Sequence, residues 1–369
     1  MKGNEFMKTQ KLLVQLTLLF AVLLPLGAAQ QNQAQVQYNV IELGGRRAID
    51  IAASGEIVGT NYSTPERIHA AYWSGSQSAP IDLGTLPGLN SGSVAINPRR
   101  QMVGNAFSDD LSVNRPLFWA SPGSGPVELP GLPAGLQGGA FDINQSGQIV
   151  GVFNSSDLSV QRAVYWPNSN AAPVYLPQLS TGLPLSSATS INASGKIQGD
   201  TCAADFSECH TVFWATSTSI PVALASPGGD FINTDMVPAD SINGAGNMVG
   251  ITYNADGSVV RAVYWASSSS PAMILSTIGE FTNTFAASIS DNGQIVGFGY
   301  DQDFARQRPL LWPSATSQAI DLSTFFPAGS DWDLDTLFAN AVNNRGEIIG
   351  SGLKDGALHD FVLVPVHGD

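Results

Sequence analysis

The chain has 369 residues, of which 38 are Gly, 22 are Pro and only 12% are charged, and its formal net charge at pH 7 is -14. This turn-rich, lightly charged composition is typical of all-β proteins with many short strands. Because phosphate repels a negatively charged protein, nucleic acid and anionic lipid are poor candidates for a partner.

Residues 1–29 are predicted to be an export signal. Three lysines precede an apolar run over residues 12–26, and the small residues 27–29 follow it. The run is short for a membrane span, although a retained anchor is the alternative. We therefore expect a secreted, periplasmic or cell-surface protein without a membrane span in its mature form, with a short polar linker over residues 30–36.

The chain contains two cysteines, Cys202 and Cys209, on either side of an expected hairpin tip. In an oxidising compartment they are candidates for a local disulfide, and two free thiols are the alternative. Two sulfurs with one nearby histidine do not make a zinc site. We expect no metal and no cofactor.

One pattern recurs seven times along the chain. It reads A-x-x-I-N-x-x-G-x-I-V-G, then a variable loop, then R/H-x-x-Y/F-W, and it closes with a stretch similar to I-D-L-G-T-L. The second glycine recurs at steps of 45 to 53 residues, at Gly59, Gly104, Gly151, Gly199, Gly250, Gly297 and Gly350. The tryptophan falls at Trp73, Trp119, Trp166, Trp214, Trp265 and Trp312, with Leu363 in the seventh position.

Each repeat holds four apolar segments of strand length, which in the third repeat cover residues 140–144, 148–151, 163–166 and 174–176. Four short antiparallel strands in a unit of this size are typical of a propeller blade. The pattern therefore predicts an all-β, seven-bladed β-propeller over residues 37–366, nearly without helices.

The last repeat lacks its fourth strand, and residues 38–44 match that missing segment. We expect this N-terminal strand to complete the last blade and close the ring, which removes two exposed sheet edges.

The first strand of each repeat should lie nearest the axis. Two columns of mostly small residues, headed by Ala48 and Asp50, are expected to crowd the axis there. Asp50, Asp142 and Asp240 then become candidate channel carboxylates. The tryptophans on the third strand should pack in the core between blades, since a buried aromatic ring removes about 150–250 Å² from water.

A basic column also recurs, at His69, Arg115, Arg162, His210, Arg261, Arg308 and His359. An acid stands five residues earlier in five repeats, at Asp110, Asp157, Asp205, Asp256 and Asp303. We interpret the column as a repeated structural contact between the hairpin tip and the third strand. A ring of cation sites for an anionic ligand is the alternative.

The motifs H/R-A-x-Y/F-W, I-N-x-x-G-x-I-V-G and I-D-L-G-T-L resemble the HAF repeats of bacterial extracellular proteins, over nearly all of residues 38–364. The departures are Ala52 and Ser290 for the Asn, Arg100 for the Gly and Leu363 for the Trp. The resemblance implies an exported or surface repeat protein with a propeller fold. It brings no agreed reaction and no catalytic residues.

Strand polarity sorts the loops between two ends of the propeller. Connections from the second to the third strand, and from the fourth to the next first strand, emerge together at one end, here called the loop face. Variable loops on a rigid scaffold are where function usually lies, so we expect the site on the loop face, around the mouth of the axis. The candidates for ligand binding are Trp332, Asp331, Asp333 and Asp335, followed by Asp230 and Phe231.

Two alternatives apply to the segment around Trp332. The ring can instead pack within its own loop. The alternating acids are similar to a calcium loop, but the Gly and the terminal Glu of that motif are missing.

Three functions compete at this point. The first is a binding or scaffold module for a glycan or protein ligand. The second is a propeller hydrolase or lyase that uses carboxylates at the axial mouth, such as Asp50 and Asp142. The third is a structural matrix protein that self-associates. A monomer is the default expectation.

Overall fold

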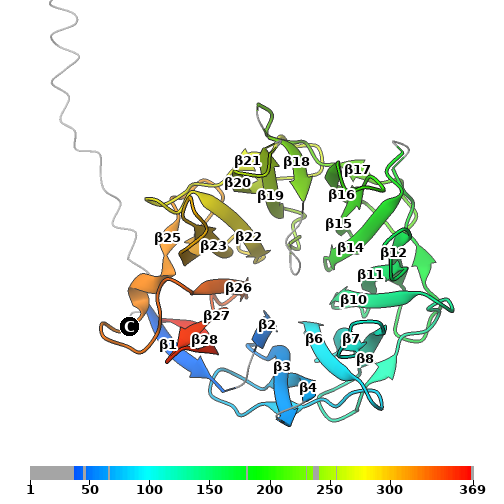
Figure 1. Ribbon diagram of the computed structural model, residues 1–369, viewed down its shortest axis with the longest axis horizontal. Helices are drawn as coiled ribbons and strands as arrows, with labels where there is room; N and C mark the ends of the chain where they lie inside the picture. Colours follow the sequence, from blue (N-terminus) through cyan, green and yellow to red (C-terminus); the bar gives the residue numbers. More distant parts are fainter. Residues whose placement is uncertain are drawn as a thin grey trace, which may run out of the picture. The chain divides into compact units, whose positions relative to one another are not determined.

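The computed structural model describes residues 37–44, 47–64, 67–179, 182–229, 231–235, 241–254 and 256–366, without the side chains of residues 62–64 and 231–235. These residues form seven four-stranded antiparallel sheets in a ring (Figure 1). The predicted seven-bladed β-propeller is therefore confirmed. The expected export signal and linker lie outside the described residues.

The strands of each blade follow one another from the axis outwards. Blades one to three contain β2 (Arg47–Ile51), β3 (Ile57–Thr64), β4 (Arg67–Trp73), β5 (Ile81–Asp82); β6 (Asn90–Ile96), β7 (Met102–Phe107), β8 (Asn114–Trp119), β9 (Val127–Glu128); β10 (Gln137–Ile143), β11 (Ile149–Asn154), β12 (Gln161–Trp166) and β13 (Val174–Tyr175). Blades four and five contain β14 (Leu185–Ile191), β15 (Ile197–Cys202), β16 (Cys209–Trp214), β17 (Val222–Ala223); β18 (Phe231–Asp235), β19 (Met248–Asn254), β20 (Val260–Trp265) and β21 (Met273–Ile274). Blades six and seven contain β22 (Asn283–Ile289), β23 (Ile295–Tyr300), β24 (Gln307–Trp312), β25 (Ile320–Asp321); β26 (Phe338–Val342), β27 (Ile348–Lys354), β28 (Ala357–Val366) and β1 (Gln37–Leu43).

The ring closes as the sequence predicts, because β1 is the outer strand of blade seven, beside β28. The helix η1 (Leu322–Phe325) is a single short 3-10 turn. Among the described residues, no helix is long and apolar enough to cross a membrane.

The recurring Asn makes two kinds of hydrogen bond at the turn between the first two strands of a blade, one within the turn and one to the next blade. In blade three, Asn144 Oδ1 accepts hydrogen bonds from the backbone N–H groups of Ser146 and Gln148, at 3.0 and 3.1 Å. Its Nδ2 donates to the Asn192 carbonyl of blade four at 3.0 Å. The same bond to the next blade is made by Asn97, Asn192, Asn243 and Asn343. The repeat motif is thus a turn cap and an interblade link at once.

The tryptophans of the third strands join each blade to the one before it. All six are fully buried. Trp119 Nε1 donates to the Leu83 carbonyl of blade one at 2.9 Å. Equivalent bonds are made by Trp73, Trp166, Trp214, Trp265 and Trp312. These rings therefore form the interblade core.

The second glycine of the repeat is explained by a close approach of two strands. A Cβ placed on Gly151 would lie 2.0 Å from the carbonyl oxygen of Gly139 on the neighbouring strand β10. No side chain fits at that distance, so this position requires glycine.

A β-bulge in the innermost strand changes which residues face the axis. The register of β2 against β3 shifts between Ala48 and Asp50, and the residue it skips is Ile49. Ala48 is fully buried and Asp50 is 3% exposed, whereas Ile49 lines the axial space. Ala48 and Asp50 therefore do not line the axial cavity described below, since an inserted residue reverses the facing of its neighbours. Asp50 borders the axial pocket at the opposite end instead.

Candidate functional site

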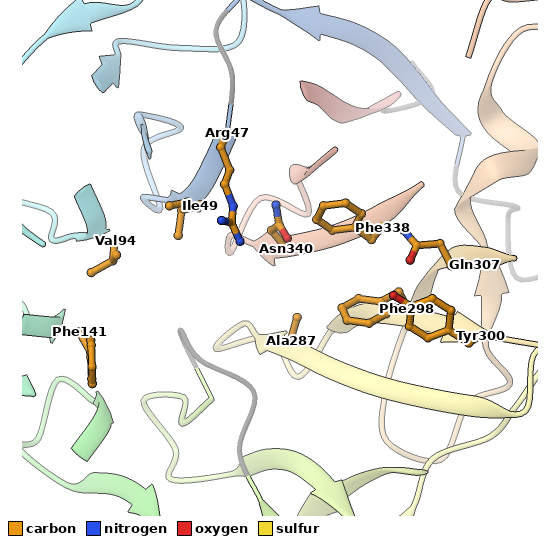
Figure 2. Close-up of a pocket in the computed structure, with 10 residues that line it drawn as sticks. All are labelled: Arg47, Ile49, Val94, Phe141, Ala287, Phe298, Tyr300, Gln307, Phe338 and Asn340. Atoms are coloured by element: carbon orange, nitrogen blue, oxygen red, sulfur yellow. The ribbon is translucent and has the colours of Figure 1, made fainter. Parts of the chain in front are cut away.

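The loop face carries a cavity of about 490 Å³ at the axial mouth. Its residues come from the starts of innermost strands, from the bulge column, from the end of β23 and from the start of β24. Figure 2 shows two unlike sides, an aromatic cluster on blades six and seven and a mainly aliphatic side on blades one to three. The cluster consists of Phe298, Tyr300 and Phe338, and the other side contains Ile49, Val94 and Phe141.

The aromatic cluster is held in place by ring-to-ring contacts. Phe298 stacks on Phe285 with ring centroids 5.0 Å apart. Its edge contacts to Tyr300 and Phe338 span 5.8 and 6.1 Å. Burial also raises the pKa of Tyr300, so its hydroxyl stays protonated at neutral pH. The cluster therefore presents a stiff, mostly apolar wall with one hydroxyl.

Three polar side chains complete the cavity. Asn340 Nδ2 donates to the Ala48 carbonyl at 2.9 Å, and Gln307 Nε2 donates to the Thr336 carbonyl at 2.7 Å, so both amides are oriented by the backbone. The Arg47 side chain is exposed, projects into the axial space in Figure 2, and makes no hydrogen bond or ion pair with another described side chain. Its charge acts on the buried Asp360, where it opposes the rise in pKa that burial causes. Among the described residues that line this cavity there is no carboxylate.

A second cavity of about 420 Å³ adjoins the first on the same face. The two share Arg47, Ile49 and Val94, and the second extends outwards to Ile68 and Phe107. Arg47 consequently stands between two apolar hollows.

The candidate channel carboxylates do not line the cavity of the loop face. Asp50 Oδ2 accepts the backbone N–H of Ile96 in the next blade at 2.8 Å, and its Oδ1 accepts from Ile51 at 2.6 Å. Asp142 is 6% exposed and accepts the backbone N–H of Ile191 in blade four at 2.6 Å. These carboxylates link neighbouring blades, and both also border an axial pocket of about 210 Å³ at the opposite end of the propeller, among the Asn turns. Asp240 lies outside the described residues.

The predicted binding segment around Trp332 is folded onto the propeller instead of presenting a platform. Trp332 is 8% exposed, and its ring makes edge contacts with Phe326 and Phe361, at 5.5 and 5.7 Å. A ring buried in this way cannot stack on a ligand, so the proposed role of Trp332 is wrong and the alternative of a ring packed within the fold applies.

The acids of that segment lie where the chain is tied to its neighbours. The Asp331 carbonyl accepts from the Asp355 backbone N–H at 3.1 Å, and the Asp333 N–H donates to the Leu353 carbonyl at 2.8 Å. Asp335 forms an ion pair with Arg308. Of the weaker candidates, Asp230 lies outside the described residues, and so does the side chain of Phe231.

The basic column contacts the fourth strand of its own blade rather than the hairpin acid. His69 Nδ1 lies 2.9 Å from Asp82, and Arg115 lies 3.6 Å from Glu128. Contacts of the same kind join His359 to Glu42, Arg308 to Asp321 and Arg162 to the ring of Tyr175. His210 instead pairs with Glu208, and Arg261 donates to its neighbouring backbone carbonyl of Val260. The predicted partner, the acid at the hairpin tip, is therefore wrong, and the basic column instead makes contacts elsewhere within its own blade.

Cys202 and Cys209 form a disulfide with an S–S distance of 2.05 Å, between directly opposed positions of β15 and β16. Within the described part of the chain, no group of three or more His, Cys, Asp or Glu residues is placed to hold a metal ion.

No protein-family model and no curated protein sequence matches the chain. Solved structures match it in fold. A structure described as YCF48 bound to a D1 peptide has a TM-score of 0.50 at 11% identity, covering 90% of this chain and 96% of that one. An oligogalacturonate lyase from Vibrio parahaemolyticus has a TM-score of 0.59 at 6% identity, covering 88% and 91%. An oligogalacturonate lyase in complex with manganese has a TM-score of 0.57 at 7% identity, covering 90% and 97%. At these identities the likeness extends to the fold alone.

Proposed function

We propose that this propeller is an exported binding protein of the HAF-repeat type, which holds an extended peptide segment of a protein ligand on its loop face. The observation that carries the proposal is the axial cavity, in which a rigid aromatic wall faces an arginine whose side chain has no hydrogen-bond or ion-pair partner among the described side chains. A pocket of this size with few polar groups is typical of a ligand site.

The chemistry of the cavity favours a peptide over a glycan. Ile49, Val94 and Ala287 supply aliphatic surface, against which a sugar would leave hydroxyls without hydrogen-bond partners. An apolar peptide side chain has no hydrogen-bonding groups that would be left without partners in the same space. Arg47 adds a charge-assisted partner for a carboxylate. The preferred ligand therefore carries an apolar or aromatic side chain close to an acidic group.

The comparisons are compatible with this proposal at the level of fold. The YCF48 structure holds a peptide on a similar architecture. The similarity to the oligogalacturonate lyase supports the alternative, a propeller hydrolase or lyase, only at the level of fold. Asp50 and Asp142, the acids suggested for that reaction, accept backbone hydrogen bonds from neighbouring blades.

Calorimetry with defined peptides tests the proposal. The capped pentapeptide Ala-Phe-Ala-Glu-Ala is compared with its Gln version on the wild type, Arg47→Gln and Phe298→Ala. Arg47→Gln should weaken the Glu peptide about tenfold and leave the Gln peptide nearly unchanged, since a hydrogen bond to a charged group contributes about 1.5–3 kcal/mol. Phe298→Ala should weaken both peptides.

Val127→Ser, on the exposed outer strand β9, is the matched control and should bind as the wild type does. Equal binding of the Glu peptide by wild type, Arg47→Gln and Phe298→Ala would refute the site. Binding or cleavage of trigalacturonate that depends on these two residues would favour the lyase alternative.

Export is tested separately, by mass spectrometry of the protein recovered outside the cytoplasm. A mature chain that begins at Gln30 supports the proposed signal, and an intact Met1 contradicts it.

A further inference from the structure

Five blades share one turn between their second and third strands, on the loop face. In blade two, the backbone N–H of Leu111 donates to the Ser108 carbonyl at 3.0 Å, and that of Ser108 donates to the Val113 carbonyl at 3.1 Å. The same two bonds recur in blades three to six. The residue that corresponds to Leu111 has a positive φ in every one of them.

Four of these turns place a large apolar residue at the positive-φ position. These tip residues are Leu111 (φ 56°, 66% exposed), Leu158 (57°, 43%), Phe206 (58°, 46%) and Phe304 (54°, 44%). The left-handed region is unfavourable for any residue with a Cβ and favours glycine. Blade five shows that the turn itself needs no side chain, because it has Gly257 there with φ 71°.

The tip residues are thus unfavourable for folding in two ways, through a strained backbone and through apolar surface left in water. Strain that persists in this way is typical of functional positions, and the four exposed apolar side chains all lie at hairpin tips of the loop face. The tips are also continuous with the axial cavity at one point, since the ring of Phe304 lies 5.4 Å from that of Tyr300.

The charge around the tips indicates what covers them. An aspartate directly precedes each tip residue, at Asp110, Asp157, Asp205 and Asp303. Serine hydroxyls and backbone N–H groups lower the pKa of Asp110 and Asp157 to about 2, so these acids are ionised at neutral pH. Anionic lipid and a second copy of this chain, with its formal net charge of -14, would both be repelled.

We propose that the four tip residues dock a basic protein surface, with each tip side chain entering an apolar hollow bordered by lysine or arginine. This inference goes beyond the proposed function, because it concerns a contact outside the cavity and does not depend on Arg47.

The test replaces all four tip residues by glycine and uses defined probes. The probes are a labelled peptide of alternating Leu and Lys, its versions with Ser for Leu and with Glu for Lys, and vesicles of phosphatidylcholine. The wild type should bind the Leu-Lys peptide at least tenfold more tightly than the Ser-Lys and Leu-Glu peptides. The glycine variant should lose that preference while its melting temperature stays the same or rises, because glycine removes the strain.

A matched control changes four equally exposed apolar residues of the outer strands to serine, at Ile81, Val127, Val222 and Ile274. This control and Arg47→Gln should both keep the binding of the Leu-Lys peptide, which separates the tips from the cavity. Four results would overturn the inference: wild-type binding by the glycine variant, a lower melting temperature of that variant, no Leu-Lys preference in the wild type, or wild-type binding to the vesicles but not to the peptide.

Discussion

Replacing Asn192 by alanine should destabilise the propeller by about 2–3 kcal/mol. The side chain is 4% exposed, its Nδ2 donates to the Asn243 carbonyl of blade five at 2.9 Å, and its Oδ1 accepts the N–H groups of Ser194 and Lys196 at 3.1 and 3.0 Å. The Ser194 hydroxyl also donates to Oδ1, at 3.1 Å, so four hydrogen bonds are lost, each with a typical net contribution of about 0.5–1.5 kcal/mol. The Asn243 carbonyl keeps its bond from Gly246, which holds the expected loss below the largest possible sum.

The opposite substitution, which adds the interblade amide where it is missing, can be made in blade one. Ala52 occupies the Asn position of blade one, where no side-chain amide can donate to the next blade. Ala52→Asn should therefore raise the free energy of unfolding by about 1 kcal/mol. Urea unfolding followed by tryptophan fluorescence measures both variants. If Asn192→Ala and Ala52→Asn both leave the unfolding free energy unchanged, the interblade amide does not stabilise the ring.

Three further predictions concern other parts of the molecule. Trp332→Ala should cost about 3–5 kcal/mol by urea unfolding, yet leave the affinity for the Glu peptide unchanged in calorimetry; weaker binding without destabilisation would restore Trp332 to the site. Replacing Cys202 and Cys209 by serine should cost about 2 kcal/mol, and melting curves with and without reductant measure this; a reductant-insensitive wild type would contradict it. Because the folded-state pKa values of Asp110 and Asp157 lie near 2, below the ordinary 3.8, their contribution to stability is complete above that ordinary value and is lost as the pH falls from it towards 2. The Asp110→Asn/Asp157→Asn double variant should thus lose less stability over this pH range than the wild type does.

The fold could be predicted from the sequence because the same structural constraints recur in seven repeats. The interblade amides, the buried tryptophans and the glycine at close strand contact each constrain a recurring position. The closing strand was predictable too, since its residues match a segment that the last repeat lacks.

The place of the axial site, around the mouth of the axis on the loop face, was predicted, but its residues were not, because a bulge residue shifts the inner strand β2 by one position. With it, Ile49 lines the axial cavity of the loop face, and Asp50 lies at the opposite end of the axis. A signal was nevertheless present in the columns. At the position of Phe298 the other blades have Thr60, Asn105, Val152, Asp200, Ile251 and Ser351, so an aromatic residue departs from the repeat.

The role of the segment around Trp332 was predicted wrongly because the packing of its ring depends on the fold. A tryptophan between acids has the composition of a binding loop, but composition does not reveal that Phe326 and Phe361 leave room for its ring. The tip residues escaped notice because their exposure and positive φ are properties of the folded turn.

Hydrogen exchange with the Glu peptide bound tests the central claim most directly, because it locates the ligand on the propeller. Binding in the axial cavity predicts slower exchange around Arg47, Tyr300 and Asn340 on the loop face, and no change at the Asn turns on the opposite face. Protection confined to those turns, or no protection under conditions where calorimetry detects binding, would contradict the account.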